Sequence, residues 1–287
     1  MYKRQGYIYF SPIVRLRQEF NLHTNLRPCK AYPGNPLNYK DGIDLVVFRE
    51  NTEGMYGGVE FHPIPQDVFD VMAKNHPKMK KFKEYGLDNL AMSTRIMSRQ
   101  KCENIVTQAF EFAKKHNRKS VTIVDKPNVL RETGGLMIRT AREVAKKYPN
   151  IPMWETNIDA QMMWLVKNPF DYDVLVAENM FGDIISDLAA QLVGGLGFAS
   201  SGNIGDNYAV FEPTHGSAPK YAGQYKVNPM AMFLTAKLML DWLQETKTAE
   251  KLENAIAQVI REGKVKTYDM GGTNTSLEVA EEVARQL

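Results

Sequence analysis

The chain has 287 residues, a formal net charge of +3, 44% hydrophobic and 24% charged residues. This composition is typical of a globular protein with one large domain or two smaller ones. Lys and Arg are spread along the chain without a basic tail, so we expect no nucleic-acid partner. No apolar stretch approaches the roughly 18 residues of a membrane span, and the start MYKRQGYIYF has no apolar signal core. We therefore expect a cytoplasmic protein with no membrane partner.

Predicted strands and helices alternate along the chain. Short apolar, β-branched runs predict strands, and apolar residues at helical spacing predict helices. The expected strands are 44–49, 120–124 and 172–177, and the expected helices are 103–115, 132–148, 181–192, 230–245, 250–262 and 276–286. Strands separated by helices indicate an α/β fold with a parallel or mixed sheet.

The pattern loosens after residue 52, where Gly57-Gly58, three prolines and the charged stretch KMKKFKEYG occur. We interpret residues of about 56–98 as an excursion from the sheet, a small clasp used in dimerisation. A long surface loop is the alternative.

Two aspartates lie at the start of the predicted helix 181–192, in the heptapeptide FGDIISD. Asp183 and Asp187 are four residues apart, so both side chains lie on one helical face. Like charges at this spacing destabilise a helix, and a divalent cation would offset the repulsion. Oxygen ligands favour Mg²⁺ or Mn²⁺ over zinc. The alternative is a solvated helix start, where the helix dipole favours acidic residues.

Several other polar residues have the chemistry of a site. Lys126 follows the strand VTIVD and precedes Pro127 and Asn128, a plausible position for a catalytic amine, although an isolated Lys is usually a surface residue. Arginines bind oxyacids through paired contacts. The arginines suited to such a substrate are Arg17, Arg27 and Arg49, and Glu53, Asp159 and His215 are further polar residues that the predicted elements do not explain.

Read together, these segments resemble the β-decarboxylating dehydrogenases of the isocitrate/isopropylmalate family, and isocitrate dehydrogenase most of all. The resemblance runs from about Tyr9 onward. Its blocks are SPIVRLRQEFNLHTNLRP, DLVVFRENTEGMYGG, VDKPNVL, NIDAQMM, ENMFGDIISDLAAQLVGGLG, NIG, EPTHGSAPKYAGQYKVNP and TYDMGGTNTS. No GxGxxG links a strand to a helix, so this is not an ordinary Rossmann pattern.

The resemblance implies a two-domain isopropylmalate/isocitrate dehydrogenase-like fold with an incomplete large domain. Family members begin with a strand and a GDGIGPE turn that are missing here, and roughly eighty residues are absent by comparison. The segment MYKRQ matches nothing in the family. We expect residues 1–21 and 195–287 to be a remnant of the large cofactor-binding domain. Residues 22–194 are expected to form the small domain, with the clasp and the metal site.

The resemblance also implies roles for individual residues. Asp183 and Asp187 would bind Mg²⁺ or Mn²⁺ from one subunit of a homodimer. Asp159 would complete the site from the other subunit, and Lys126 would reach across with it. The substrate would be held by Ser11, Arg17, Arg27, Arg49 and Asn128.

The implied chemistry has two stages. The metal and Lys126 help to remove the hydroxyl proton while a hydride leaves C2 for the nicotinamide. After loss of CO₂, Tyr56 protonates the enol at C3 as a general acid. We expect the neighbouring ammonium of Lys126 to lower the pKa of Tyr56.

The cofactor loop implied by the resemblance favours NADP, with NAD as the alternative. Lys220-Tyr221 and Tyr268 match family members that use NADP, whereas NAD users typically carry an acidic residue followed by an aliphatic one. Gly272 departs from the NADP pattern, which places an Arg there. The loop as a whole comprises His215, Gly216, Ser217, Ala218, Lys220, Tyr221, Asn228, Tyr268 and Asp269.

Isocitrate is the expected substrate, which implies the isocitrate step of the tricarboxylic acid cycle. The alternatives are homoisocitrate and 3-isopropylmalate, because SPIV places Ile13 where bacterial isocitrate enzymes carry an Asn. A hypothesis of another class is an inactive fragment that acts only as a metal- or partner-binding module.

Overall fold

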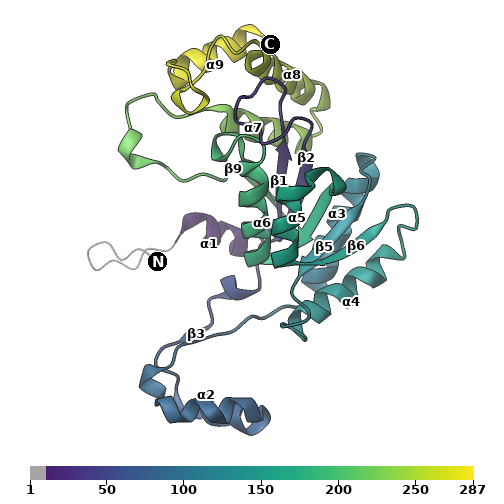
Figure 1. Cartoon of the computed structure of the whole chain (residues 1–287), viewed down its shortest axis with the longest axis vertical. Helices are drawn as coiled ribbons and strands as arrows, with labels where there is room; N and C mark the ends of the chain where they lie inside the picture. The colour runs from purple at the N-terminus through teal and green to yellow at the C-terminus, as the bar shows by residue number, and fades with distance from the viewer. Residues whose placement is uncertain (1–10) are drawn as a thin grey trace.

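The computed structural model describes residues 11–287 (Figure 1). The beginning of the resemblance near Tyr9, the segment MYKRQ and the first part of the expected 1–21 segment lie outside the described residues. None of the helices within residues 11–287 is long and apolar enough to cross a membrane.

A seven-stranded mixed sheet forms the centre of the molecule, with the order β6-β5-β7-β2-β1-β8-β9. The strands β6, β5, β7 and β2 run parallel to one another, and the pairs β2–β1, β1–β8 and β8–β9 are antiparallel. The bounds are β1 Thr24–Lys30, β2 Asp44–Glu50, β5 Val121–Asp125, β6 Met153–Asn157, β7 Val174–Ala177, β8 Ser200–Ile204 and β9 Ala209–Pro213. The sheet confirms the expected α/β class.

The three central parallel strands are apolar because helices cover both faces of the sheet. Every residue of β5 and β7 is buried, and β2 is buried after Asp44. One face packs on α3 (Arg99–Lys115) and α4 (Thr133–Ala145). The other face packs on α5 (Ile158–Lys167) and α6 (Asn179–Gln191). This layering brings the carboxyl ends of β5 and β7 to one edge, where α/β proteins place their sites.

A third core cluster lies at the opposite end of the molecule from the arm described below (Figure 1). It is formed by α7 (Met230–Trp242), α8 (Thr246–Glu262) and α9 (Ser276–Arg285), which pack on Tyr32 and Phe198. α9 begins with a capping box, because Thr275 and Glu278 satisfy each other's backbone N–H groups.

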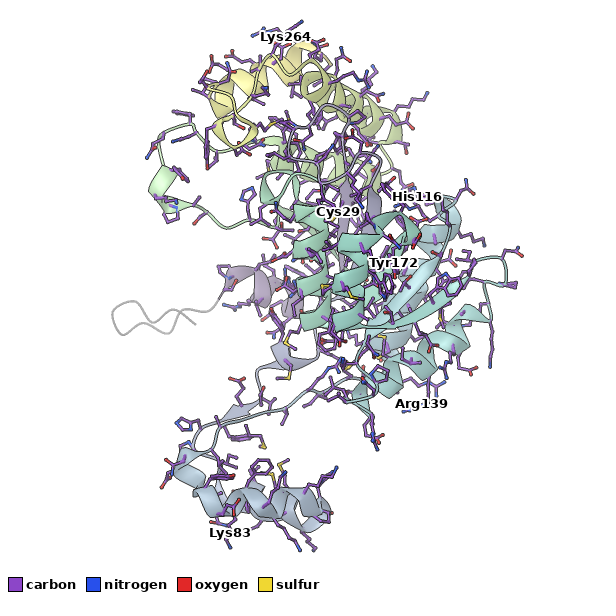
Figure 2. All side chains as sticks on the ribbon, viewed as in Figure 1. Cys29, Lys83, His116, Arg139, Tyr172 and Lys264 are labelled. Atoms are coloured by element: carbon purple, nitrogen blue, oxygen red, sulfur yellow. The ribbon has the colours of Figure 1, made fainter. Side chains whose placement is uncertain are left out.

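The predicted excursion between residues 56 and 98 is an arm that extends away from the sheet (Figure 1). It contains the 3₁₀ helix η1 (Met55–Gly57), the short strands β3 (Glu60–Phe61) and β4 (Met92–Ser93), and α2 (Gln66–Asn75), followed by the 3₁₀ helices η2 (Pro77–Tyr85) and η3 (Leu87–Asn89). Figure 2 shows Lys83 of η2 at the far end of the arm. The segment is therefore not a plain surface loop, and its use in dimerisation stays a prediction.

The expected domain boundary at residues 194 and 195 falls within one continuous sheet. β8 follows that boundary and pairs with β1, so strands from both expected domains share hydrogen bonds. The division into 22–194 and a remnant of 1–21 with 195–287 stays a prediction. α1 (Pro12–Glu19), which belongs to the first expected segment, leads directly into β1.

Candidate active site

α6 begins at the carboxyl end of β7 and carries both candidate metal aspartates. It starts at Asn179, two residues earlier than predicted, because the Glu178 side chain accepts a hydrogen bond from the Phe181 N–H at 2.9 Å. Such an N-cap satisfies a backbone donor that the helix itself leaves free. Asp183 and Asp187 follow on the next turns of the helix, as predicted.

Two buried arginines from adjacent strands converge on Asp183. Arg27 of β1 donates from Nη1 to Asp183 Oδ1 at 3.2 Å, to Ser186 Oγ at 2.6 Å and to Asp187 Oδ1 at 3.4 Å. Arg49 of β2 forms an ion pair with Asp183 through Nη1. It also donates from Nε and Nη2 to Asn179 Oδ1 at 2.9 and 2.7 Å. The predicted substrate arginines and metal aspartates therefore share one site.

Arg17 of α1 adds a third buried guanidinium. Its Nε donates to Asn203 Oδ1 at 2.9 Å, and its Nη2 lies 3.5 Å from Glu212 Oε1. Burial lowers the pKa of Arg17, and the charge of Arg27 lowers it further, against the effect of Glu212. Burial, together with the charge of Arg27, likewise lowers the pKa of Arg49 to about 10. The three guanidinium groups are charge-assisted donors of the kind that bind a carboxylate substrate.

Tyr56 of η1 completes this group. Its hydroxyl donates to Asp183 Oδ2 at 2.9 Å, and the Arg49 guanidinium lies 5.1 Å from the centre of its ring. Partial burial raises the pKa of Tyr56, and the negative charge of Asp183 raises it further. Within residues 11–287 of one chain, Asp183 rather than an ammonium lies beside the hydroxyl, and a lowering of this pKa by a Lys126 that reaches across from the other subunit stays a prediction.

Lys126 and Asp159 form a separate pair. Lys126 follows β5, Asp159 lies in the first turn of α5, and the two side chains form an ion pair. The hydrogen bond from Lys126 lowers the pKa of Asp159. Within residues 11–287 of a single chain, no three His, Cys, Asp or Glu side chains gather as a metal would require. The placing of Asp159 in a metal site shared between subunits stays a prediction.

The residues present fit a divalent cation that also binds substrate. Asp183 and Asp187 supply carboxylate oxygens, the ligands that Mg²⁺ and Mn²⁺ prefer. Burial raises the pKa of Asp187, and the nearby charge of Asp183 also raises it. Mg²⁺ usually binds one or two protein carboxylates and takes its other ligands from water and substrate. Asp183 and Asp187 of one chain can therefore supply the protein carboxylates of such a site.

The predicted cofactor residues gather around η6 (Pro219–Tyr221) and η7 (Tyr268–Met270). The rings of Tyr221 and Tyr268 lie 5.9 Å apart, and Lys220 Nζ lies 4.8 Å from the centre of the Tyr221 ring. The hydrogen bond with Tyr268, followed by that with Lys220, lowers the pKa of Tyr221. Lys226, which sequence reasoning missed, lies 4.8 Å from the Tyr268 ring and 5.7 Å from the Tyr221 ring.

The remaining predicted cofactor residues lie in the loop before α7 and in η7. Asn228 donates to Asp269 Oδ2 at 3.0 Å and accepts from the Met230 N–H at the start of α7. Ala218 adopts a left-handed conformation with φ of 43°. His215 contacts the carbonyl of Gly216 through Nδ1 at 3.0 Å, and Ser217 is exposed.

Gly272 is a steric necessity in this fold. A Cβ at this position would lie 2.0 Å from the carbonyl oxygen of Lys266. The Arg of the NADP pattern therefore cannot replace Gly272 without a backbone shift. Lys226 places a cation beside Tyr268 instead.

Two predicted substrate residues lie outside the arginine group. Ser11 is half-buried at the N-cap of α1 and makes no side-chain capping bond, and Asn128 is exposed in the turn after Lys126. Sequence reasoning missed the partners that orient the arginines, namely Asn179, Ser186 and Asn203. Asn203 Oδ1 also accepts from Asn25 at 2.8 Å and Asn51 at 3.0 Å. The position of Asn203 in the NIG block is the sequence feature that could have indicated its role.

Comparison with known proteins identifies the family of this chain. The family model described as isocitrate/isopropylmalate dehydrogenase matches residues 4–284. The 3-isopropylmalate dehydrogenase of Archaeoglobus fulgidus is 45% identical over 275 residues, which cover 96% of this chain and 76% of that protein. A probable mitochondrial NAD isocitrate dehydrogenase alpha subunit of Drosophila melanogaster is 40% identical over 274 residues, which cover 96% of this chain and 66% of that protein.

A solved structure matches the whole fold. The isocitrate dehydrogenase of Methylococcus capsulatus has a TM-score of 0.87 and 36% identity, covering 100% of this chain and 79% of that one. The chain thus spans about two thirds to four fifths of these relatives. The family model and these relatives define an NAD(P)-dependent decarboxylating dehydrogenase class. The chain belongs to the isocitrate/isopropylmalate dehydrogenase family.

Proposed function

We propose that this chain catalyses the oxidative decarboxylation of isocitrate to 2-oxoglutarate, with NADP as hydride acceptor and Mg²⁺ or Mn²⁺ as metal. Homoisocitrate and 3-isopropylmalate are the alternative substrates, since the relatives divide between isocitrate and isopropylmalate enzymes. The observation that carries the proposal is the convergence of buried Arg27 and Arg49 on Asp183, with Arg17 buried nearby.

The charges at the site suit a polycarboxylate bound together with a metal ion. Arg17, Arg27 and Arg49 face Asp183, Asp187 and Glu212, so the side chains alone are close to neutral. A tricarboxylate adds about three negative charges and the divalent ion two positive ones, which nearly cancel. A guanidinium has five N–H donors. Each arginine can therefore donate to a substrate carboxylate in addition to, or in place of, its present acceptor.

The protein groups divide the proton transfers between them. Lys126, in its neutral form and freed from the ion pair with Asp159, would take the proton of the substrate hydroxyl, and a bound nicotinamide would supply the acceptor for the hydride from C2. A divalent metal held by Asp183 and Asp187 would supply the charge that stabilises the oxygen at C2. The bond between C3 and its carboxylate then breaks with loss of CO₂, and Tyr56 donates a proton to C3 of the resulting enol. The contact with Asp183 keeps Tyr56 protonated, as a general acid must be before it acts.

The preference for NADP rests on four side chains around the cofactor loop. Lys220 and Lys226 bring two cations to the rings of Tyr221 and Tyr268, and neither lysine has an ion-pair partner within residues 11–287. Two cations and two hydroxyl groups suit a 2′-phosphate. An acidic residue would instead suit the free ribose hydroxyl of NAD.

A homodimer with shared sites is part of this proposal. Asp159, Met163 and Val166 recur at helical spacing on one face of α5, and all three are exposed. On α6, Ile184 is also exposed and lies three residues before Asp187. Asp159 and Asp187 therefore border apolar surface that a second copy of the chain would cover. A second copy would also bring its Asp159 towards the aspartates of this chain.

The test is a matrix of initial rates with purified protein. Isocitrate, homoisocitrate and 3-isopropylmalate are each assayed with NADP and NAD in the presence of Mn²⁺. We expect the highest kcat/KM for isocitrate with NADP. Comparable or higher values for another acid would move the assignment to that acid, and no turnover with any pair would leave the metal- or partner-binding module as the better account.

A further inference from the structure

A buried ionic cluster lies between the base of the arm and the carboxyl edge of the sheet. Arg95, just after β4, donates from Nη1 and Nη2 to the two oxygens of Asp125 at 3.3 and 2.8 Å. Its Nη2 also lies 3.7 Å from Glu178 Oε1, and its guanidinium lies 5.1 Å from the centre of the Phe181 ring. The side chains of Asp125, Glu178 and Arg95 are 0%, 1% and 7% exposed.

This cluster is costly to keep. One guanidinium faces two carboxylates, and Glu178 Oε2 has no hydrogen-bond partner within the described part of the chain. Apolar residues of similar volume often fill such positions with equal or greater stability. A role in stability alone therefore accounts poorly for three buried charges.

Each carboxylate controls the start of a segment that carries candidate catalytic or metal groups. Asp125 Oδ1 accepts from the backbone N–H of Lys126 at 2.7 Å, so it fixes the residue proposed to take the hydroxyl proton. Glu178 Oε1 accepts from the N–H of Phe181 and so fixes the first turn of α6, two residues before Asp183. Arg95 contacts both, and it comes from the arm rather than from either segment.

We propose that Arg95 is a positioning residue that holds the Lys126 turn and the first turn of α6 in fixed relation and couples both to the arm. The assignment of a catalytic consequence rests on the proposed dehydrogenase function, whereas the mechanical link does not. Arg95 touches neither substrate nor cofactor and acts through Asp125 and Glu178.

Loss of Arg95 should therefore affect the chemical step more than substrate binding. A misplacement of about 1 Å in a catalytic group can cost up to about 100-fold in rate. We expect Arg95→Met to lower kcat by about 10- to 100-fold while the KM for the hydroxy acid changes by less than about threefold. Arg95→Lys should recover part of kcat, because it keeps one charge between the two carboxylates but loses the paired contacts.

A second variant leaves every charge in place. A Cβ at Gly134, in the first turn of α4, would lie 2.5 Å from Asp125 Oδ1 and 3.3 Å from the Cα of Pro127. Gly134→Ala should therefore displace the Asp125 carboxylate and reproduce part of the kcat loss. Arg99→Met is the matched control, because Arg99 is exposed at the start of α3 and has no ion-pair partner within residues 11–287.

Hydrogen exchange tests the link without any assay of activity. In Arg95→Met, the amides of Lys126 and Phe181 should exchange faster together, by about tenfold or more, while those of α8 stay unchanged. Arg99→Met should alter neither the exchange rates nor kcat. Unchanged exchange at both amides, or a kcat that stays normal in folded Arg95→Met, would overturn the proposal. If the parent protein turns over none of the acids, the proposed function fails, and the paired exchange result still decides whether Arg95 joins the two segments.

Discussion

The hydroxyl of Tyr56 donates to Asp183 Oδ2 at 2.9 Å, although 127 residues separate the two in the chain. The proposed proton donor to C3 and a proposed metal ligand are thus in direct contact. Tyr56 comes from the base of the arm and Asp183 from α6, so the placing of the arm bears directly on the site.

Tyr56→Phe separates the two chemical stages. The variant should slow turnover of the hydroxy acid but still reduce the carboxylated ketone intermediate, because that step does not use the proton donor to C3. Its loss should appear in proton exchange at C3 of the decarboxylated keto acid, followed by NMR, at about 10²- to 10⁴-fold. Equal damage to all three reactions would show that Tyr56 only positions the substrate.

Exchanging the cofactor-loop pair tests the preference for NADP. Lys220→Asp with Tyr221→Ile should move the preference towards NAD, mainly by raising the KM for NADP. One lost charge-assisted contact costs roughly 1.5–3 kcal/mol, or about 10- to 150-fold. The exposed Lys247→Asp on α8 is the control for a change of charge alone. A parent protein that already prefers NAD by about tenfold contradicts the assignment.

Glu253 of α8 should make the free energy of unfolding depend on pH. Burial alone would raise its pKa, but the hydrogen bond from Lys30 and the charge of Lys237 outweigh burial and lower the pKa from 4.5 to about 2. A lowered pKa in the folded state means that this stabilisation is fully present above about pH 4.5 and disappears as the pH falls through about 2.

Glu253→Gln should therefore reduce the free energy of unfolding by about 1.5–3 kcal/mol at pH 7. Its deficit should shrink between about pH 4.5 and 2, as measured by urea unfolding across that range. Glu250→Gln, three residues away and exposed, is the control. A deficit that is constant with pH would show that Glu253 contributes packing rather than charge.

The apolar surface of α5 and α6 should control association. Met163→Glu with Ile184→Glu places charges where we propose that a second copy packs, so the dimer should dissociate at micromolar concentration in sedimentation velocity. Leu277→Glu, on α9, changes an equally exposed apolar residue outside that surface. Retention of the parent mass by the double variant, or its loss in the control, would refute this interface.

Three of the four parallel strands were predictable from sequence, whereas β6 at the sheet edge and the antiparallel strands were not. β2, β5 and β7 are buried on both faces and therefore read as apolar runs. The sequence of β1, TNLRPCK, contains no apolar run that would predict a strand. Its arginine faces the site, and Pro28 interrupts the pattern. Pro28 is tolerated because β8 pairs only with residues 24–26 of β1, so the missing N–H lies beyond that pairing.

The residues of the candidate site also differ in whether the sequence indicated them. Spacing and resemblance both singled out Asp183 and Asp187, whereas the resemblance alone implied roles for Arg17, Arg27 and Arg49. The residues that orient them were not predictable, because Asn179, Arg95 and Glu178 are defined only by contacts between distant segments. The charge nearest to Tyr56 within one chain, that of Asp183, likewise became known only with the fold.

The most direct test of the central claim is to measure NADPH and CO₂ together from isocitrate and Mn²⁺, in the parent protein and in Asp183→Asn. We predict one CO₂ for each NADPH, loss of both in chelator, and a fall in kcat on the order of 10²-fold or more for Asp183→Asn. Turnover that persists in chelator, or that is unchanged in Asp183→Asn, would contradict a metal-assisted decarboxylating site on α6.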